Sequence, residues 1–209
     1  GVLLRGQRCS MQETGRKTVT LVLGGVRSGK SRWAQQLAAG AARVAYVATA
    51  QPVGAEMAEK IRRHREERPS HWHTFEEPLE LGRVIAEHAA AFDVVLVDCL
   101  TVFTANLLAA ADAEPLGIAR RIENFLEALR TSPVSLVLIS NEVGSGVVPP
   151  YPAGRRFRDV LGELNQRVAA ISDNVVLLVA GLPLVLRGAI AAPPCSLIPA
   201  AEMDKEPAL

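Results

Sequence analysis

Residues 24–31 read Gly24-Gly25-Val26-Arg27-Ser28-Gly29-Lys30-Ser31 and match the pattern GxxxxGK followed by Ser or Thr at every fixed position. The β-branched, apolar residues 18–23 come directly before this stretch and predict a strand, and residues 31–39 predict the helix that it opens. A strand, a glycine-rich loop and a helix in this order are the context that a phosphate-binding loop requires. We therefore expect every residue from 24 to 31 to contact a nucleotide.

The residue types in this loop suit the chemistry of a polyphosphate. Gly24 and Gly29 let the backbone come close to phosphate oxygens, and the amides of the loop and of the helix start face negative charge. Lys30 is placed to neutralise the outer phosphates, and we expect it to act in catalysis. The hydroxyl of Ser31 is expected to hold Mg²⁺. The alternative is a chance glycine turn before a capped helix.

Apolar and amphipathic segments alternate along the rest of the chain. Strands are predicted at 18–23, 44–48, 94–97, 136–139 and 175–180, and residues 184–186 are expected to fold back beyond Gly181 and Pro183. Helices are predicted at 31–39, 56–67, 79–91, 101–110, 118–130 and 158–172. Strands separated by helices indicate an α/β fold with a mostly parallel sheet flanked by helices.

The length of 209 residues fits one domain. We assign residues 18–190 to a single P-loop NTPase domain, because no linker or internal repeat interrupts them. Residues 1–17 are expected to form a flexible leader, with Met11 as an alternative start. Residues 191–209 carry several prolines and are expected to form an irregular tail.

The composition argues against several classes of protein. Hydrophobic residues make up 49% of the chain, too many for a chain disordered throughout. A net charge of +1 and 4% aromatic residues argue against a dedicated nucleic-acid-binding protein. The three cysteines form no CxxC pair, so we expect reduced thiols and a cytoplasmic location. No apolar run reaches the roughly 20 residues that a membrane span needs.

A second magnesium ligand is expected at the end of a strand that neighbours the strand of the loop. Asp98 follows the apolar residues 94–97 and fits this position, although it could instead cap the helix that begins near Thr101. Glu142 follows another buried strand and could be a base, a second metal contact or an ordinary loop carboxylate. Neither NKxD nor TKxD occurs, so the usual guanine-reading loop of switch GTPases is missing.

One predicted helix carries a histidine among arginines. His64 shares a helix face with Met57 and Ile61 and is therefore expected to point toward the body of the protein. Neighbouring arginines, among them Arg62 and Arg65, are expected to lower the pKa of the imidazole and keep it neutral, the state in which it attacks phosphorus. The alternative is a histidine with ordinary partners in the core.

The remaining histidines and both tryptophans favour structural interpretations. His71 and His73 could point the same way in an extended segment, but two ligands without a third make a poor metal site. We interpret them as loop or edge residues. Trp33 and Trp72 are expected to pack rather than to stack on a base.

Seven blocks in a fixed order extend the pattern over most of the chain. They are GGVRSGKSRWA, VAYVATAQ, EMAEKIRRHREERPSHWHTFEEP, DCLTVFTANLL, SNEVGSGVVP, RRFRDVLGELNQRVA and VVLLVAGLPLVL. With these blocks the chain resembles the bifunctional adenosylcobinamide kinase / adenosylcobinamide-phosphate guanylyltransferase family of cobalamin biosynthesis, from about Thr18 to Arg187. A phosphate-binding loop alone would be generic, whereas the ordered set of blocks is specific.

The resemblance implies a fold of the RecA-like type and two reactions. The first phosphorylates adenosylcobinamide with ATP or GTP. The second transfers GMP from GTP through a guanylylated histidine and gives adenosylcobinamide-GDP. His64 matches the position of that histidine. One alternative is a P-loop small-molecule kinase without guanylyltransferase activity, and another is a non-catalytic nucleotide-dependent switch.

The resemblance also implies a set of site residues and partners. Nucleotide contacts are expected from the loop together with Arg62, Arg65, Glu76 and Asp98, and Mg²⁺ contacts from Ser31 and Asp98. The expected partners are ATP, GTP, adenosylcobinamide and its phosphate, with no nucleic acid and no membrane. The family implies a homotrimer.

Overall fold

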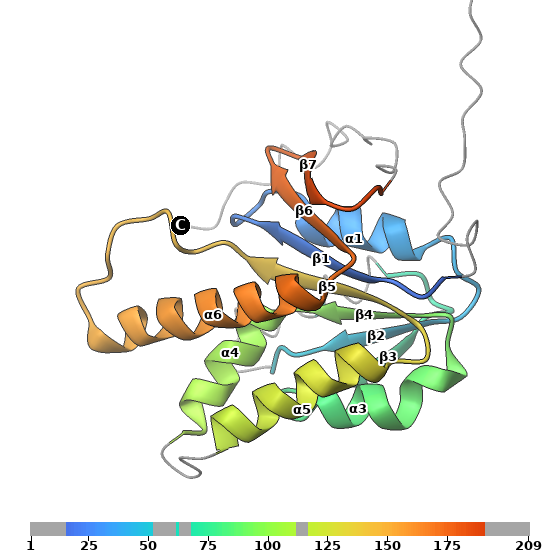
Figure 1. Cartoon of the computed structure of the whole chain (residues 1–209), viewed down its shortest axis with the longest axis horizontal. Helices are drawn as coiled ribbons and strands as arrows, with labels where there is room; N and C mark the ends of the chain where they lie inside the picture. Colours follow the sequence, from blue (N-terminus) through green and yellow to red (C-terminus); the bar gives the residue numbers. More distant parts are fainter. Residues whose placement is uncertain (1–15, 52–61, 63–67, 112–116, 191–209) are drawn as a thin grey trace, which may run out of the picture.

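The computed structural model describes residues 16–51, 62, 68–111 and 117–190. Seven strands form one sheet in the order β3-β2-β4-β5-β1-β6-β7 (Figure 1). They are β1 (Val19–Gly24), β2 (Val44–Ala48), β3 (His73–Glu76), β4 (Val94–Asp98), β5 (Ser135–Asn141), β6 (Asn174–Val179) and β7 (Leu182–Arg187). Neighbouring strands are parallel except β6 and β7, which pair antiparallel. The predicted α/β fold with a mostly parallel sheet is confirmed.

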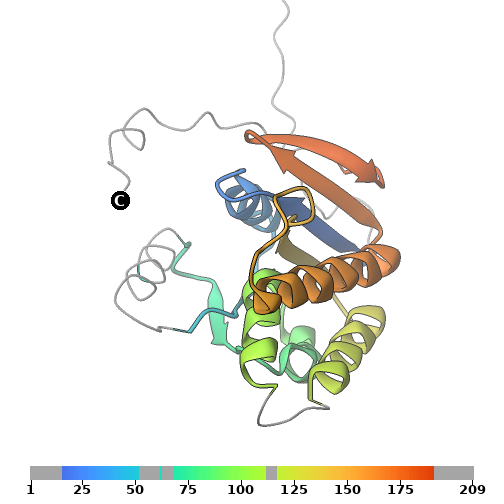
Figure 2. The same cartoon turned by 90° about the vertical axis from the view of Figure 1, so that its left-hand side faces the viewer.

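Helices cover both faces of the sheet (Figure 2). They are α1 (Lys30–Ala38), α3 (Leu81–His88), the 3-10 helix η1 (Ala89–Ala91), α4 (Leu100–Ala109), α5 (Gly117–Thr131) and α6 (Pro152–Ile171). Helix α1 packs on one face, and α3, α4, α5 and α6 pack on the other. The central strands β1, β2, β4 and β5 therefore need apolar residues on both sides, which explains their largely apolar sequences.

Alternate residues of each strand enter opposite core layers. Leu21 of β1 packs with the layer under α3 to α6, and its neighbour Val22 packs with the layer under α1. Both side chains are completely buried. Because parallel pairing aligns the strands, the carboxyl ends of β1, β2, β4 and β5 lie along one edge of the sheet. The loops at this edge are where an open α/β sheet binds ligands.

Three elements differ from the sequence prediction. Helix α6 begins at Pro152 rather than at 158, with proline in the first turn, where its missing amide costs nothing. The predicted helix 79–91 divides into α3 and η1. Residues 73–76 form the edge strand β3, whose side chains are mostly exposed and therefore carry little apolar signal.

Three further predictions concern the helix 56–67, the end of the sheet and membrane spans. The predicted helix 56–67 lies outside the described residues, apart from the exposed, helical Arg62. The fold-back of residues 184–186 is confirmed, because they belong to β7. Among the described helices, none is long and apolar enough to cross a membrane.

Candidate functional site

The phosphate-binding loop links the end of β1 to the start of α1. Gly29 has a φ of 90°, in the left-handed region that favours glycine, and α1 begins at Lys30. A side chain at Gly24 would come within 2.3 Å of Ser28 Oγ and 2.9 Å of the Leu178 carbonyl oxygen. Nothing lies within 4 Å of the corresponding position at Gly25. A side chain at Gly24 would therefore collide with the protein, Gly29 has a backbone conformation that favours glycine, and Gly25 faces open space.

Neighbouring elements hold the loop by backbone hydrogen bonds. The amide of Glu142 donates to the carbonyl oxygen of Gly24 at 3.2 Å, and the amide of Gly181 donates to that of Ser28 at 2.9 Å. The hydroxyl of Ser28, a residue only 8% exposed, is buried without a hydrogen-bond partner in the described part of the chain. A buried orphan hydroxyl in a phosphate-binding loop is a group that a ligand can satisfy.

Lys30 lies between the loop and the end of β4. Its Nζ donates to the carbonyl oxygen of Gly25 at 3.1 Å. Its positive charge is also near enough to Cys99 to oppose the rise in the pKa of that thiol. Since Cys99 directly follows Asp98, the structure brings the basic residue of the loop toward the predicted magnesium carboxylate.

Asp98 ends β4, as predicted, but β4 does not neighbour β1. Strand β5 lies between them, so the expectation of an adjacent strand is wrong. The Tyr46 hydroxyl donates to Asp98 Oδ2 at 2.7 Å. Burial raises the pKa of Tyr46 well above its ordinary value, and the charge of Asp98 adds to this rise. The phenol therefore remains protonated and orients the carboxylate, whose other oxygen, Oδ1, can face a cation.

Thr49 fixes the backbone that follows Asp98. Its Oγ1 accepts the amide of Cys99 at 2.8 Å and donates to the Cys99 carbonyl oxygen at 2.9 Å. The side chain of Asn106, on α4, donates to the Thr49 carbonyl oxygen at 2.8 Å. The ends of β2 and β4 and helix α4 are therefore joined by hydrogen bonds.

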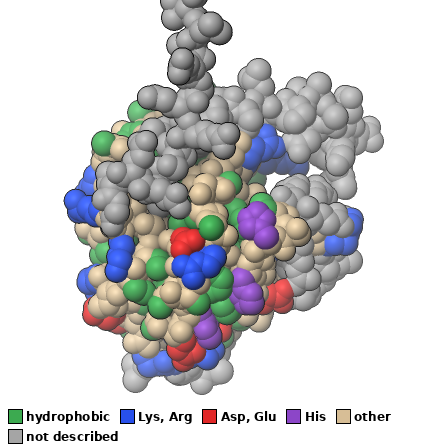
Figure 3. Space-filling model, turned by 90° about the vertical axis from the view of Figure 1, so that its right-hand side faces the viewer, with side chains coloured by type: hydrophobic (Ala, Val, Ile, Leu, Met, Phe, Trp, Pro, Cys, Tyr) green, Lys and Arg blue, Asp and Glu red, His purple; other side chains and the backbone are tan. Residues whose placement is uncertain are grey.

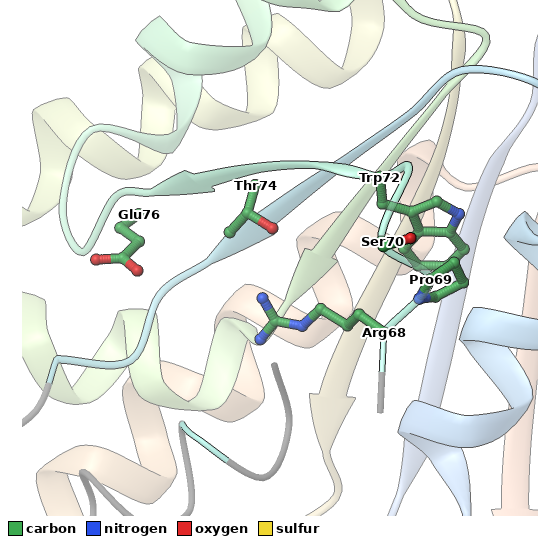
Figure 4. Close-up of a pocket in the computed structure, with 6 residues that line it drawn as sticks. All are labelled: Arg68, Pro69, Ser70, Trp72, Thr74 and Glu76. Carbon is green, nitrogen blue, oxygen red and sulfur yellow. The ribbon is translucent and has the colours of Figure 1, made fainter. Parts of the chain in front are cut away.

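A hollow of about 340 Å³ lies beside β3. Its lining residues are Arg68, Pro69, Ser70, Trp72, Thr74 and Glu76. The Arg68 guanidinium points along the hollow toward Thr74 and Glu76, while Pro69, Ser70 and Trp72 close the other end (Figure 4).

Arg68 connects this hollow to Asp98 through Tyr46. Its Cζ lies 3.6 Å from the centre of the Tyr46 ring, a cation–π contact, and the same tyrosine binds Asp98. Within the described residues, Nε and Nη1 of Arg68 are buried without hydrogen-bond partners. Two buried donors on a cation suit an anionic or carbonyl-bearing ligand.

Some of the other predicted site residues lie within the described chain and some lie outside it. Glu76 is exposed at the end of β3, beside Ala48 of β2. His64 and Arg65 lie outside the described residues. Glu142 Oε1 accepts the Gly144 amide at 2.6 Å, which gives that oxygen a role in the loop turn.

The described histidines lie away from the loop. Figure 3 shows histidine side chains at the surface on the side that is the right-hand side of Figure 1, whereas the phosphate-binding loop lies toward the left. His73 packs edge-on against Phe75, with ring centres 4.6 Å apart, and His88 stacks on Phe75 at 4.9 Å. His73 lies on an edge strand, as predicted, and Trp72 is buried.

Sequence reasoning missed Tyr46 and Thr49 as parts of the site. Tyr46 is a buried hydroxyl residue in the middle of the apolar strand β2, and Thr49 is a buried hydroxyl residue directly after that strand, which was the available signal. Their hydrogen bonds depend on how β2 pairs with β4, with Ala48 beside Asp98.

The comparisons with known proteins identify the family of the chain. The family described as cobinamide kinase / cobinamide phosphate guanyltransferase matches residues 20–186. The chain is 46% identical to the bifunctional adenosylcobalamin biosynthesis protein CobP of Pseudomonas aeruginosa, over 80% of this chain and 96% of that protein. It is 39% identical to the bifunctional adenosylcobalamin biosynthesis protein CobU of Salmonella typhimurium, over 80% of this chain and 98% of that protein.

A solved structure supports the fold. It is a prototypical ATPase from the type III secretion system of pathogenic bacteria, with a TM-score of 0.53 and 12% identity. The likeness covers 84% of this chain and 56% of the ATPase chain, and it bears on the fold alone. The architecture is that of a RecA-like P-loop NTPase, and the chain belongs to the cobinamide kinase / cobinamide phosphate guanyltransferase family.

Proposed function

We propose that this protein phosphorylates adenosylcobinamide with ATP or GTP and then transfers GMP from GTP to the product, giving adenosylcobinamide-GDP in cobalamin biosynthesis. One observation carries the proposal: an intact phosphate-binding loop, held at the ligand-binding edge of the sheet, lies within a family match over residues 20–186. The alternative is a small-molecule kinase of the same fold without guanylyl transfer.

In the kinase step the protein positions the reactants and neutralises charge. Backbone amides from Gly24 to Ser31 surround the phosphates, and Lys30 moves from the Gly25 carbonyl oxygen to the outer phosphates. Ser31 and Asp98 provide a hydroxyl and a carboxylate, the oxygen ligands that Mg²⁺ prefers. Mg²⁺ held there would neutralise the charge that develops on the transferred phosphoryl group.

In the guanylyl step we assign the nucleophile to His64. Its nitrogen attacks the α-phosphorus of GTP, a bond from nitrogen to phosphorus forms, and the bond to pyrophosphate breaks. The phosphate of adenosylcobinamide phosphate then attacks the same phosphorus and releases the histidine. Arg62, Arg65 and Glu76 are proposed to contact the nucleotide during this exchange.

Several further properties are part of the proposal. Residues 18–190 form the catalytic domain, flanked by the leader 1–17 and the tail 191–209. The protein works as a homotrimer in the cytoplasm, on corrinoid and nucleotide substrates rather than on nucleic acid.

The decisive experiment is intact-protein mass spectrometry after incubation with GTP and Mg²⁺. The parent protein and a His88→Ala control should gain the mass of one GMP, because His88 stacks on Phe75 away from the loop. His64→Ala should gain nothing and keep kinase activity. A gain in all three proteins would show that the nucleophile is a residue other than His64. No gain in any, from protein that binds GTP, would favour the kinase-only alternative.

A further inference from the structure

The loop between β5 and α6 exposes apolar side chains beside the phosphate-binding loop. Val147 is 94% exposed, Val148 64% and Tyr151 75%. Contiguous exposed apolar residues mark binding surfaces more often than isolated ones do. We refer to Val147, Val148 and Tyr151 as the β5–α6 platform.

Helix α6 holds this platform in place through two arginines. Arg158 donates to the carbonyl oxygens of Val147 at 3.2 Å and Gly144 at 2.9 Å. Arg155 donates to those of Pro149 at 3.0 Å and Pro150 at 2.8 Å. These bonds pair four carbonyl oxygens of the loop with arginines of α6 and hold the loop against the helix.

The first turn of α6 also packs closely on the loop. A side chain at Gly154 would come within 2.8 Å of Pro149 Cβ. The ring of Pro149 therefore occupies space that a side chain at position 154 would need. Together with Arg155 and Arg158, this contact makes the loop a preformed surface, and preorganisation of this kind reduces the entropic cost of binding.

The platform is continuous with the nucleotide site. Asn141 ends β5 beside Gly24, and the amide of the next residue, Glu142, binds the Gly24 carbonyl oxygen. The views in Figures 1 and 2 agree that the loop after β5 projects on the same side of the molecule as the start of α1. A molecule seated on the platform would lie beside the phosphates of a bound nucleotide.

We propose that the β5–α6 platform binds the corrin ring of the acceptor and thereby presents the acceptor hydroxyl to the nucleotide. This inference rests on the proposed function. A corrin ring is a broad macrocycle with apolar methyl groups and peripheral amides. Val147 and Val148 offer apolar contacts, and Tyr151 offers a ring face and a hydroxyl that can hydrogen-bond an amide.

The position of the platform fits the geometry that phosphoryl transfer needs. The acceptor oxygen has to approach the terminal phosphorus in line, while the bulk of the acceptor remains outside the narrow phosphate-binding loop. A rigid apolar surface at the rim achieves this without occupying the nucleotide site. The exposed apolar residues of β7 lie on an edge strand outside this loop and serve as the comparison.

The test is binding of adenosylcobinamide and of a nucleotide, measured separately by calorimetry. The probe variant is Val147→Ser with Tyr151→Ser, and the matched control is Leu184→Ser with Leu186→Ser, residues that are 55% and 56% exposed. We expect the probe variant to bind adenosylcobinamide about tenfold more weakly, the effect of losing two apolar contacts. Its nucleotide affinity should stay within about twofold of the parent, and the control should match the parent for both ligands.

Each other outcome overturns the proposal in a distinct way. Unchanged adenosylcobinamide binding in the probe variant removes the platform from the acceptor site. Equal weakening in the control means that general surface hydrophobicity is responsible. A changed sedimentation coefficient with unchanged binding makes the platform a contact between copies of the chain. Failure of the parent itself to bind adenosylcobinamide rejects the proposed function, and the platform with it.

Discussion

The amide of Gly181 donates a hydrogen bond of 2.9 Å to the carbonyl oxygen of Ser28, so the turn between β6 and β7 braces the phosphate-binding loop. Ala180 and Gly181 form this turn with φ values of 52° and 81°, both in the left-handed region. The Cα of Gly181 also lies 3.4 Å from where a side chain at Gly29 would be. The antiparallel hairpin at the end of the sheet therefore reaches the nucleotide site.

Gly181→Ala should weaken nucleotide binding. No atom lies within 4 Å of the added methyl group, so the effect comes from backbone strain, about 1–2 kcal/mol for a residue with a side chain at positive φ. As the turn relaxes, the loop loses its brace, and we expect the KM for ATP to rise about three- to tenfold. Steady-state kinetics at saturating adenosylcobinamide measure this.

Gly162→Ala is the matched control for that variant. Gly162 lies within α6 and also has open space around it, so alanine there should leave KM unchanged and stabilise the helix slightly. An unchanged KM in Gly181→Ala would show that the hydrogen bond to Ser28 does not hold the loop.

Ala180→Asn should stabilise the protein. Alanine at a φ of 52° is strained, whereas asparagine tolerates this conformation and is preferred before glycine in such a turn. We expect the free energy of unfolding in urea to increase by about 0.5–1 kcal/mol. Ala90→Asn, at an exposed position of η1, should bring no increase. Equal effects at the two positions would contradict the explanation by turn strain.

The strand, loop and helix around the phosphate-binding motif could be predicted because the motif answers local backbone demands. Gly29 needs a left-handed φ, and Lys30 opens the helix that follows. By contrast, the Tyr46–Asp98 hydrogen bond joins residues of two strands and depends on their pairing, which no local pattern encodes.

Helix α6 begins earlier than its sequence predicts, and the arginines of its first turns explain the difference. The first turns of this helix carry Arg155 and Arg158, which bind the carbonyl oxygens of the preceding loop. They therefore present no apolar stripe, and the helical periodicity of the sequence becomes visible only further along.

Tyr46→Phe should raise the Mg²⁺ requirement of the kinase reaction. The ring and its contact with Arg68 remain, but the hydrogen bond that orients Asp98 is lost. Loss of a residue that orients a metal ligand typically costs about tenfold in metal affinity. A Mg²⁺ titration of the phosphorylation rate should show this shift, while nucleotide binding without Mg²⁺ stays at the parent value. Identical titrations for the two proteins would argue that Asp98 does not hold the metal.

Cys99 should resist alkylation in the native protein. It is partly buried against the core layer under α1, and this burial raises the pKa of its thiol to about 11, with the charge of Asp98 adding to the rise. Since the thiolate is the reactive form, iodoacetamide at pH 8.5 should modify Cys99 in urea but leave it largely unmodified in the native protein. Peptide mass spectrometry distinguishes it from Cys9 and Cys195.

The raised pKa of the Cys99 thiol makes part of the free energy of unfolding depend on pH. The folded-state pKa of the Cys99 thiol lies above its unfolded value of about 8.5, so the native state holds the proton more tightly. This contribution is complete below about pH 8.5 and is lost as the pH rises toward 11. Urea unfolding at pH 7.5, 9 and 10.5 should therefore show a smaller loss of stability in Cys99→Ala than in the parent. The high pKa of Tyr46 is common to both proteins, so parallel losses in the two would exclude Cys99 as the titrating group.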